Sequence, residues 1–348
     1  MSSSFTAVKP EYNTAPWLEV LARYHSPSLG KSIWQIVNSI VPYLALWVLA
    51  YFSLKVSYWL TLVLAIPMAG FLIRIFIIFH DCVHDSFFKS RLANDTLGIV
   101  TGILTYTPYY QWKKNHKIHH DSAGDLGRRG VGDIWTLTSA EYLAFPPWKR
   151  LAYRLYRNPL VMFVLGPLYV VLISNRLAGR AAGRKERFSI YLTNLALLGL
   201  LVGVGVSIGF KSFLLVQLPV YLIGFAAGFW LFYVQHQFEG VYWEEHQEWD
   251  FISSAMKGSS FYKLPKILRW FTGRIGYHHI HHLCPRIPNY YLAKCYSEHP
   301  MFQEIKPITL TASFKSLSFR LWDQESNRLV GFSHLRKLRK SKAVAGQV

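Results

Sequence analysis

Two long apolar stretches, far apart in the chain, constrain its fold more than any other feature. Residues 33–79 carry only two charged side chains, Lys55 and Arg74, and residues 190–234 carry one, Lys211. Each stretch is long enough for two membrane-crossing helices of about 20 residues, joined by a tight turn near Lys55 or Lys211. The sequence therefore predicts an all-α integral membrane protein with two transmembrane helical hairpins, which makes four spans.

Two weaker apolar stretches leave the number of spans open. Residues 97–110 are too short to cross comfortably, and residues 160–174 contain Gly166 and Pro167 and have arginines on both sides. A crossing by the second stretch would place basic residues outside, against the positive-inside tendency. We therefore expect re-entrant or interfacial segments, and six spans only if both stretches hide hairpins. Residues 17–24 fit a short amphipathic helix on the membrane surface.

The chain is strongly basic, with a net charge of +19 from 38 Lys and Arg against 19 Asp and Glu. The positive charge falls between the apolar runs, which favours cytoplasmic loops at an anionic membrane surface and argues against a nucleic-acid partner. Three cysteines are too few for a disulfide framework or an Fe–S cluster. The basic residues around the polar motifs and in the tail are Lys113, Lys114, Lys117, Arg128, Arg129, Lys257, Lys263, Lys266, Arg269, Arg274, Arg336, Lys337, Arg339, Lys340 and Lys342.

Most of the fourteen histidines fall in three clusters, HDCVH, HKIHH and HHIHH, each just outside an apolar run or in a later polar segment. Positions i and i+3 or i+4 share one face of a helix, so each cluster can point two or three imidazoles at one spot. An even number of crossings places all the clusters on one face, and the basic residues make that face cytoplasmic. The predicted metal ligands are His80, His84, His116, His119, His120, His278, His281 and His282.

The number of imidazoles indicates the kind of metal site. Eight or nine neutral imidazoles exceed the capacity of one ion and suit two transition-metal ions. Neither the Glu-x-x-His pair of soluble di-iron proteins nor the HExxH motif of zinc proteases occurs. Four nearby acids could accept the second ring N–H of a ligand, or could instead cap helices and pair with local Lys and Arg. These acids are Asp81, Asp85, Asp121 and Asp125.

The remaining histidines are expected to lie outside the ligand set. His279 falls off the repeating spacing, so we expect it beside the ligands or in a loop. Four isolated histidines fit ordinary solvated or hydrogen-bonded roles, and they are His25, His246, His299 and His334.

The segments HDCVHDSFF, HKIHH, WLFYVQHQFEGVYW and GYHHIHHLCPRIPNY together resemble the membrane-bound acyl-lipid fatty acid desaturases. The resemblance is closest to the Δ5-type acyl-lipid desaturases of Bacillus, and weaker to the cyanobacterial Δ12 type. It runs from about residue 30 to residue 325, through RLYRNP, GSSFYKLPK and SFRLWD. It implies a cytoplasmic N-terminal segment (1–30), a membrane desaturase domain (31–325) and a basic C-terminal tail (326–348).

The resemblance also implies a site and a reaction. Nine histidines in a cytoplasmic helical cap would hold two Fe ions, the ninth being His236 in VQHQFE. The enzyme would use O2 and electrons from a reduced ferredoxin or flavodoxin. It would introduce a cis double bond into acyl chains of membrane phospholipids, and the resemblance favours the Δ5 position. It would be a multi-pass protein of the cell membrane. Trp112, Trp135 and Tyr233 are candidates for the acyl tunnel, or members of an interfacial belt or core.

Two alternative functions stay open at this point. The three histidine clusters alone do not separate a desaturase from a lipid or carotenoid hydroxylase or ketolase on the same scaffold, because both reactions begin by removing hydrogen from carbon. An alternative of another class is a non-catalytic membrane metal- or haem-binding protein, which would need ligands within the spans.

Overall fold

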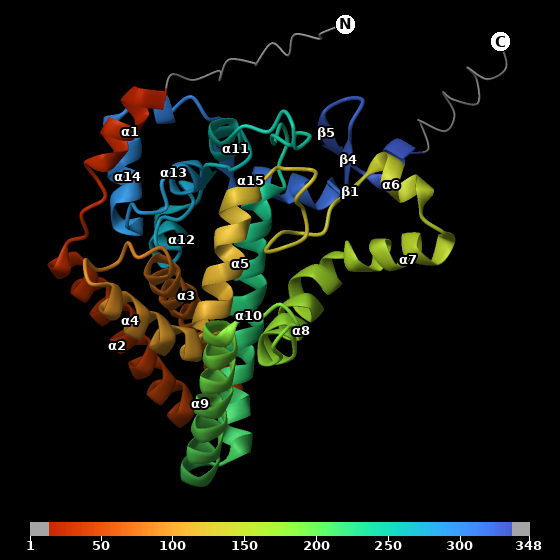
Figure 1. Cartoon of the computed structure of the whole chain (residues 1–348). Helices are drawn as coiled ribbons and strands as arrows, with labels where there is room; N and C mark the ends of the chain where they lie inside the picture. The colour runs from red at the N-terminus through yellow and green to blue at the C-terminus, as the bar shows by residue number, and fades with distance from the viewer. Residues whose placement is uncertain (1–13, 336–348) are drawn as a thin grey trace, which may run out of the picture.

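Four long helices form the centre of the fold. The computed structural model describes residues 14–335, in which the four helices stand together as two hairpins (Figure 1). The first hairpin comprises α2 (Leu29–Ser53) and α3 (Tyr58–Val83), and the second comprises α9 (Arg184–Ile208) and α10 (Phe210–His236). Each of these helices is long and apolar enough to cross a membrane. The predicted helical class with four spans is therefore confirmed.

The turns of both hairpins lie where the central lysines predict them. Lys55 lies between α2 and α3, where the hydroxyl oxygens of Ser53 and Thr61 are 2.7 Å apart. Helices α9 and α10 meet at Gly209, whose φ of 82° is a left-handed conformation that glycine adopts at little steric cost. Lys211 follows in the first turn of α10. Each hairpin therefore turns at an exposed lysine, as the interruptions in the apolar runs indicate.

Helix α3 joins the two hairpins by packing against both α2 and α10. A polar contact joins α2 directly to α10, where Gln217 accepts hydrogen bonds from the Tyr43 hydroxyl at 3.1 Å and the Trp47 indole at 2.8 Å. Gly224 permits the close approach of α10, because a Cβ at that position would lie 3.1 Å from Leu72. The buried apolar residues shared by these helices are Tyr43, Ala50, Ala65, Met68, Ala69, Phe71, Leu72, Ile75, Val216 and Val220.

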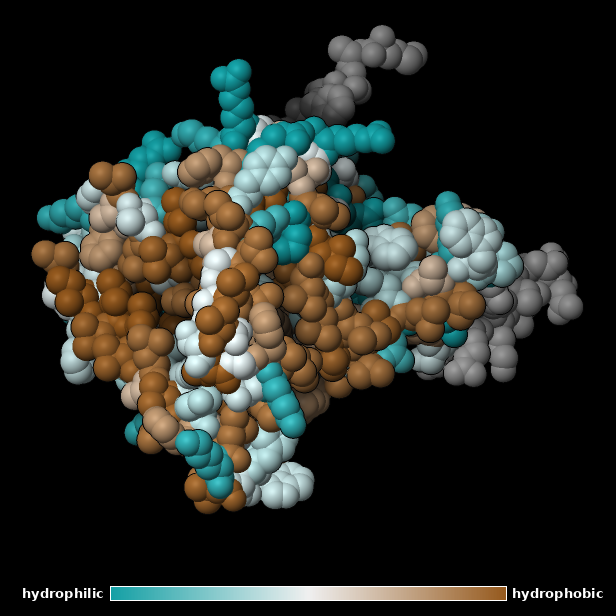
Figure 2. All heavy atoms as spheres, turned by 90° about the horizontal axis from the view of Figure 1, so that it is seen from below, coloured by the Kyte–Doolittle hydropathy of each residue, from teal (hydrophilic) through white to brown (hydrophobic). Residues whose placement is uncertain are grey.

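The outward faces of the spans are also apolar. Figure 2 shows hydrophobic side chains covering most of the bundle when it is viewed from the end away from the cap. Exposed apolar surface of this extent marks contact with lipid rather than water. Together with the length of the helices, it indicates a membrane protein. Representative exposed side chains are Val41, Leu44, Val48, Trp59, Val63, Ile66, Leu195, Leu198, Val206, Leu214 and Leu218.

The two weaker apolar stretches form short or bent helices. Helix α4 (Arg91–Leu104) has 14 residues, so it is about 21 Å long, against a hydrocarbon core of roughly 30 Å. Helix α7 (Pro147–Tyr156) and the segment Val161–Arg176 are bent by 64° at their junction, as in a broken span or a re-entrant loop. The described residues thus contain four spans, or five if the bent pair is one span. They do not support the alternative of six.

The segment after that bend consists of short turns of different helix types. It contains a π-helical turn η1 (Val161–Leu165), helix α8 (Gly166–Leu172) and a 3-10 turn η2 (Ser174–Arg176). Figure 1 shows α7 and α8 extending to one side of the bundle.

A cap of shorter helices lies over one end of the bundle (Figure 1). Its helices are α1 (Thr14–Ala22), α5 (Tyr109–Ser122), α6 (Ser139–Ala144), α11 (Phe251–Lys257), α12 (Lys266–Phe271), α13 (His278–Leu283), α14 (Asn289–Glu298), η3 (Pro300–Phe302), α15 (Leu310–Ser313) and η4 (Phe314–Ser318).

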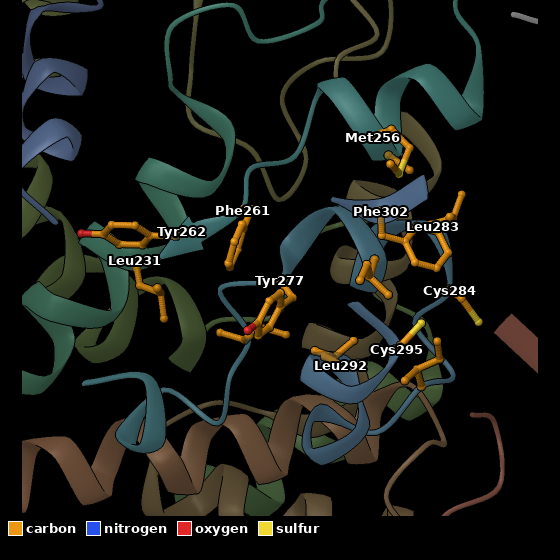
Figure 3. Close-up of a cluster of buried hydrophobic side chains, with 14 of the residues drawn as sticks. Leu231, Met256, Phe261, Tyr262, Tyr277, Leu283, Cys284, Leu292, Cys295 and Phe302 are labelled. Atoms are coloured by element: carbon orange, nitrogen blue, oxygen red, sulfur yellow. The ribbon is translucent and has the colours of Figure 1, made fainter. Parts of the chain in front are cut away.

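Helix α1 corresponds to the amphipathic helix expected over residues 17–24. Its apolar face, however, packs on the cap: Trp17 and Leu21 are buried, and the Trp17 ring lies 5.5 Å from the Phe302 ring in an edge-to-face contact. Figure 3 shows Phe302 with Leu283 and Met256 in the core that receives this face. These side chains of α1 therefore contact the protein and not the lipid.

Two small sheets tie distant segments of the cap together. In the first, β4 (Leu321–Asp323) pairs parallel with β1 (Leu137–Thr138), Leu321 opposite Leu137, and antiparallel with β5 (Arg328–Val330). In the second, β2 (Tyr262–Lys263) pairs parallel with β3 (Ile308–Thr309). The start of the expected basic tail (326–348) thus includes the paired strand β5. Its basic residues Arg336, Lys337, Arg339, Lys340 and Lys342 lie outside the described residues, as do residues 1–13.

Candidate metal centre

The first histidine cluster extends a membrane span into the cap. His80 lies in the last turn of α3, and His84 is the residue that caps this helix. Asp85 follows with a φ of 53°, a left-handed conformation that aspartate tolerates better than most residues. The chain therefore leaves the helix directly after the second histidine. The two imidazoles point to one side, with ring centroids 4.8 Å apart.

The second cluster lies on α5, which begins after Pro108 and carries its histidines in its last turns. Adjacent histidines on this helix serve different neighbours. Nε2 of His120 lies 3.1 Å from Nε2 of His116, whereas Nε2 of His119 lies 3.1 Å from Nε2 of His236 at the end of α10. Helix α5 therefore supplies imidazoles to two places at once.

The third cluster forms α13, a helix of six residues that is buried throughout. Nε2 of His278 lies 3.0 Å from Nε2 of His236, and Nε2 of His281 lies 3.1 Å from Nε2 of His120. Like α5, this helix divides its histidines between two places. His236, the ninth predicted ligand, lies within this arrangement.

The nine predicted histidines form two adjoining groups, within each of which the candidate ligand atoms lie within 4.8 Å of one another. The groups touch where the rings of His120 and His282 stack, with centroids 4.1 Å apart. The five-histidine group consists of His80, His84, His116, His120 and His281, and the four-histidine group consists of His119, His236, His278 and His282.

The chemistry of both groups fits transition-metal ions. At a metal–nitrogen distance of about 2.1 Å, two ligands at right angles lie about 3.0 Å apart, close to the Nε2–Nε2 distances of 3.0 and 3.1 Å here. Each group also holds a buried Nε2 atom, on His84 and on His282, that has no hydrogen-bond partner among residues 14–335. A buried imidazole nitrogen without a partner is costly unless it binds something.

Burial keeps these imidazoles in the form that binds metals. Removal from water, followed by the charge of neighbouring imidazoles, holds the pKa of the ligand candidates in the cap well below the usual value for histidine. Neutral rings carry the free lone pair that a metal needs. The six histidines so affected are His84, His116, His120, His278, His281 and His282.

The second nitrogen of some rings is held by groups outside the two histidine groups. Nδ1 of His119 lies 2.5 Å from a carboxylate oxygen of Asp133, and Nδ1 of His236 lies 3.2 Å from the carbonyl oxygen of Gly258. Such contacts fix the tautomer that points Nε2 at a metal. Asp133 was not among the predicted acids, because it lies in a loop 14 residues after His119 and no helical spacing connects them.

The four predicted acids have other principal partners. Asp81 lies 3.5 Å from Nδ1 of His80, but its second oxygen accepts shorter hydrogen bonds, at 2.7 and 2.8 Å, from the backbone and side chain of Asn289. The other three acids pair with lysine or arginine side chains near them in the sequence or the fold. The pairs are Asp85 with Lys113, Asp121 with Lys117, and Asp125 with Arg128.

The other five histidines lie outside both groups. His279 is buried next to the site, where its Nε2 contacts the Phe302 carbonyl at 3.1 Å. The other contacts are His25 with the Cys284 thiol, His246 with Asp125, His299 with the Tyr24 hydroxyl, and His334 with Asp323.

The three aromatic candidates for the acyl tunnel lie in different surroundings. Trp112 stacks on His116, with ring centroids 4.1 Å apart, and therefore borders the five-histidine group. Trp135 is 40% exposed and contacts Tyr153. Tyr233 is buried, and its hydroxyl donates to the carbonyl oxygens of Ser316 and Phe319. Of the three, only Trp112 touches a predicted ligand ring, and a role in binding an acyl chain stays a prediction.

Known proteins are similar to this chain over most of its length. The sequence profile of the fatty acid desaturase family matches residues 56–307. The chain is 51% identical over 318 residues to "Fatty acid desaturase" of Bacillus subtilis (strain 168), covering 91% of this chain and 90% of that protein. It is 27% identical over 248 residues to "Delta(12) fatty acid dehydrogenase" of Crepis alpina, covering 64% of this chain and 63% of that protein.

A third relative is a cyanobacterial enzyme. Over 252 residues the chain is 24% identical to "sn-1 acyl-lipid omega-3 desaturase (ferredoxin)" of Nostoc sp. (strain 36), covering 67% of this chain and 64% of that protein. The matched residues of this chain, 56–307, include all three histidine clusters and His236. The similarity thus covers nearly the whole chain, including both histidine groups at the end of the four-span bundle. The protein belongs to the fatty acid desaturase family, a family of oxidoreductases.

Proposed function

We propose that this enzyme introduces a cis double bond at the Δ5 position of acyl chains in membrane phospholipids, within a domain spanning residues 31–325 between an N-terminal segment (1–30) and a basic tail (326–348). The observation that carries the proposal is the pair of adjoining histidine groups at the end of a lipid-facing bundle. The nearly full-length similarity to a Bacillus desaturase supports the reaction. The double-bond position rests on the resemblance of the sequence alone.

The nine histidines would hold two Fe ions, five histidines on one and four on the other. When bound, iron would supply the oxygen activation that is required to remove hydrogen from unactivated CH2 groups. The net reaction converts –CH2–CH2–, O2, two electrons and two protons into –CH=CH– and two water molecules. The side chains of this chain hold the ions, fix the ring tautomers and exclude bulk water from the buried groups.

The electrons would come from a reduced ferredoxin or flavodoxin at the cytoplasmic face of the cell membrane. The name of the Nostoc relative includes ferredoxin. The net charge of +19 would attract a partner with an acidic surface. Some of the basic side chains near the second cluster are already paired, such as Lys113 with Asp85 at 2.8 Å. Lys89, Arg91 and Arg184 are exposed and remain available for such contacts.

The decisive experiment is expression in a bacterial host without fatty acid desaturases, followed by mass spectrometric location of double bonds in intact phospholipids. The proposal predicts Δ5-unsaturated chains that require O2. Unsaturation at another carbon would overturn only the Δ5 position. Hydroxylated or oxo products would favour a hydroxylase or ketolase, and unchanged lipids from a metal-loaded protein would favour the non-catalytic alternative.

A further inference from the structure

Arg157, at the end of α7, is fully buried and lies beside the metal centre. Its guanidinium donates to five neutral oxygens: those of Trp135 (carbonyl, 3.2 Å), Thr136 (hydroxyl, 3.3 Å), Tyr233 (hydroxyl, 3.3 Å), Gln237 (side chain, 3.0 Å) and Phe319 (carbonyl, 3.0 Å). No carboxylate of the described residues lies within 4.0 Å of it. A buried cation without an anionic partner is rare, because desolvation of the charge is costly.

The five acceptors belong to three segments that are far apart in the sequence. Trp135 and Thr136 lie in the loop before β1, Tyr233 and Gln237 lie at the end of α10, and Phe319 precedes β4. Further bonds connect the same segments: Gln237 donates to the Thr136 hydroxyl at 3.3 Å, and Tyr233 donates to the Phe319 carbonyl at 3.1 Å. The planar guanidinium of an arginine presents five N–H donors in fixed directions, whereas the ammonium of a lysine is a compact group with three.

Two of these segments contact or carry members of the four-histidine group. Gln237 directly follows His236, one of its four members, and Tyr233 lies three residues before it on α10. Trp135 follows Asp133 by two residues, and Asp133 contacts Nδ1 of His119, another member, at 2.5 Å. His119 and His236 in turn approach each other to 3.1 Å between their Nε2 atoms. The Arg157 guanidinium thus connects the loop whose Asp133 orients the His119 ring to the end of α10 that carries His236.

We propose that Arg157 is a positioning residue for the four-histidine metal site. It keeps the loop that carries Asp133 at a fixed distance from the end of α10, and so keeps His119 and His236 aimed at one ion. The five-histidine group has no comparable link to Arg157: among residues 14–335, none of its members adjoins an acceptor of Arg157 in sequence or forms a hydrogen bond with the loop that carries Asp133. This inference rests on the proposed function, because it assumes that both groups bind iron.

The test is a chelator titration of the iron-loaded protein in detergent, with released iron counted per chain. Arg157→Lys keeps the charge but loses the fork. In this variant, one equivalent of iron should leave at a chelator concentration about 10 to 100 times lower than in the wild type. The second equivalent should leave as in the wild type. The Mössbauer spectrum should change for one of the two irons only.

A matched control and a second variant separate positioning from general destabilisation. Tyr43→Phe removes a buried hydroxyl of α2 that donates to Gln217 within the span bundle and touches none of the segments held by Arg157, so it should lower the melting temperature without changing iron release. Gln237→Met removes the acceptor next to His236 and should weaken one iron about threefold to tenfold, even if Arg157→Lys does not fold.

The outcomes distinguish this inference from the proposed function. A wild-type protein that binds no iron overturns both. A wild-type protein with two irons, together with folded Arg157→Lys and Gln237→Met variants that release iron as the wild type does, overturns the positioning role alone. Equal weakening of both irons in these variants also overturns it, because the role is specific to the four-histidine site.

Discussion

At the scale of single residues, the contact between Asp133 and His119 shows how the site is supported from outside its ligands. The carboxylate accepts a hydrogen bond from Nδ1 at 2.5 Å, and the His119 side chain is fully buried. A carboxylate in this position orients the ring and makes its other nitrogen a better ligand. The same residue lies on the loop that Arg157 holds.

Replacing Asp133 tests this support directly. Asp133→Asn should lower iron affinity or desaturation by about 10-fold to 100-fold, because the amide is a weaker acceptor and can present its NH2 group to the ring. Iron per chain and unsaturated product per iron are the measurements. Asp121→Asn is the matched control, since Asp121 is half exposed and pairs with Lys117 at the surface; a surface pair of this kind contributes about 0–1 kcal/mol. Full iron binding by Asp133→Asn would contradict the assigned role.

The buried imidazoles also predict how stability depends on pH. Burial lowers the pKa of His279 to about 4 and holds that of six ligand candidates well below the usual value. Below about pH 6.5 the unfolded chain gains protons at these histidines and the folded chain does not. The unfolded state then binds more protons, so the free energy of unfolding decreases as the pH falls.

The measurement is the melting temperature of the metal-free protein in detergent between pH 7.5 and pH 5.5. We expect a continuous decrease over this window. Carboxylates with lowered pKa, such as Asp125 and Glu141, contribute only at lower pH. A melting temperature that stays constant or rises toward pH 5.5 would show that these rings are solvated in the folded protein.

At the scale of secondary-structure elements, the contact between α4 and α5 holds the first two histidine clusters together. Gly98 of α4 lies against the Tyr109 ring, where a Cβ would approach to 2.2 Å. The Tyr109 hydroxyl donates to the Cys82 carbonyl of α3 at 2.9 Å, between His80 and His84. Displacing Tyr109 would therefore disturb both α3 and α5.

Gly98→Ala should accordingly destabilise the protein by about 1–3 kcal/mol, since overpacking in a tight contact forces side chains or backbone to move. Thermal unfolding and iron content measure the effect. Gly203→Ala in α9 is the matched control, because a Cβ at that position meets nothing within 4 Å. If both variants melt at the wild-type temperature, the contact is looser than described.

Local sequence patterns predicted most of these elements, and their failures share one physical cause. Helical spacing grouped the eight histidines of the three clusters, and apolar length predicted the hairpins, because both signals lie within one element. The Asp133 contact, the acceptors of Arg157 and the packing of Trp17 on Phe302 join residues far apart in the chain. His236 is intermediate: the resemblance, rather than any spacing, assigned it as a ligand.

At the scale of the whole molecule, the hairpin turns lie at one end of the bundle, and the cap with α13, which carries the third histidine cluster, lies at the other (Figure 1). If the histidines face the cytoplasm, Lys55 and Lys211 face the other side of the membrane. Single cysteines at these positions should therefore react with an impermeant maleimide in intact spheroplasts. A cysteine replacing the exposed His246 of the cap should react only after lysis.

The native cysteines favour this experiment, because Cys82, Cys284 and Cys295 are all buried and should give little background. The unsubstituted protein is the control. Labelling of the His246→Cys variant in intact spheroplasts, with protection at positions 55 and 211, would reverse the orientation.

The apolar outer face of the spans has a consequence for how such an enzyme would be studied. Under the proposed function, the lipids that surround the spans are also the substrate of the enzyme. Acyl chain supply would then be a mole fraction of the bilayer rather than a concentration in water, and it would vary little while oxygen and reductant vary widely. Each turnover would also alter the medium around the catalyst, since a cis bond disorders neighbouring chains. Rates measured in one bilayer composition would therefore describe the enzyme only for that composition, and would drift as product accumulates.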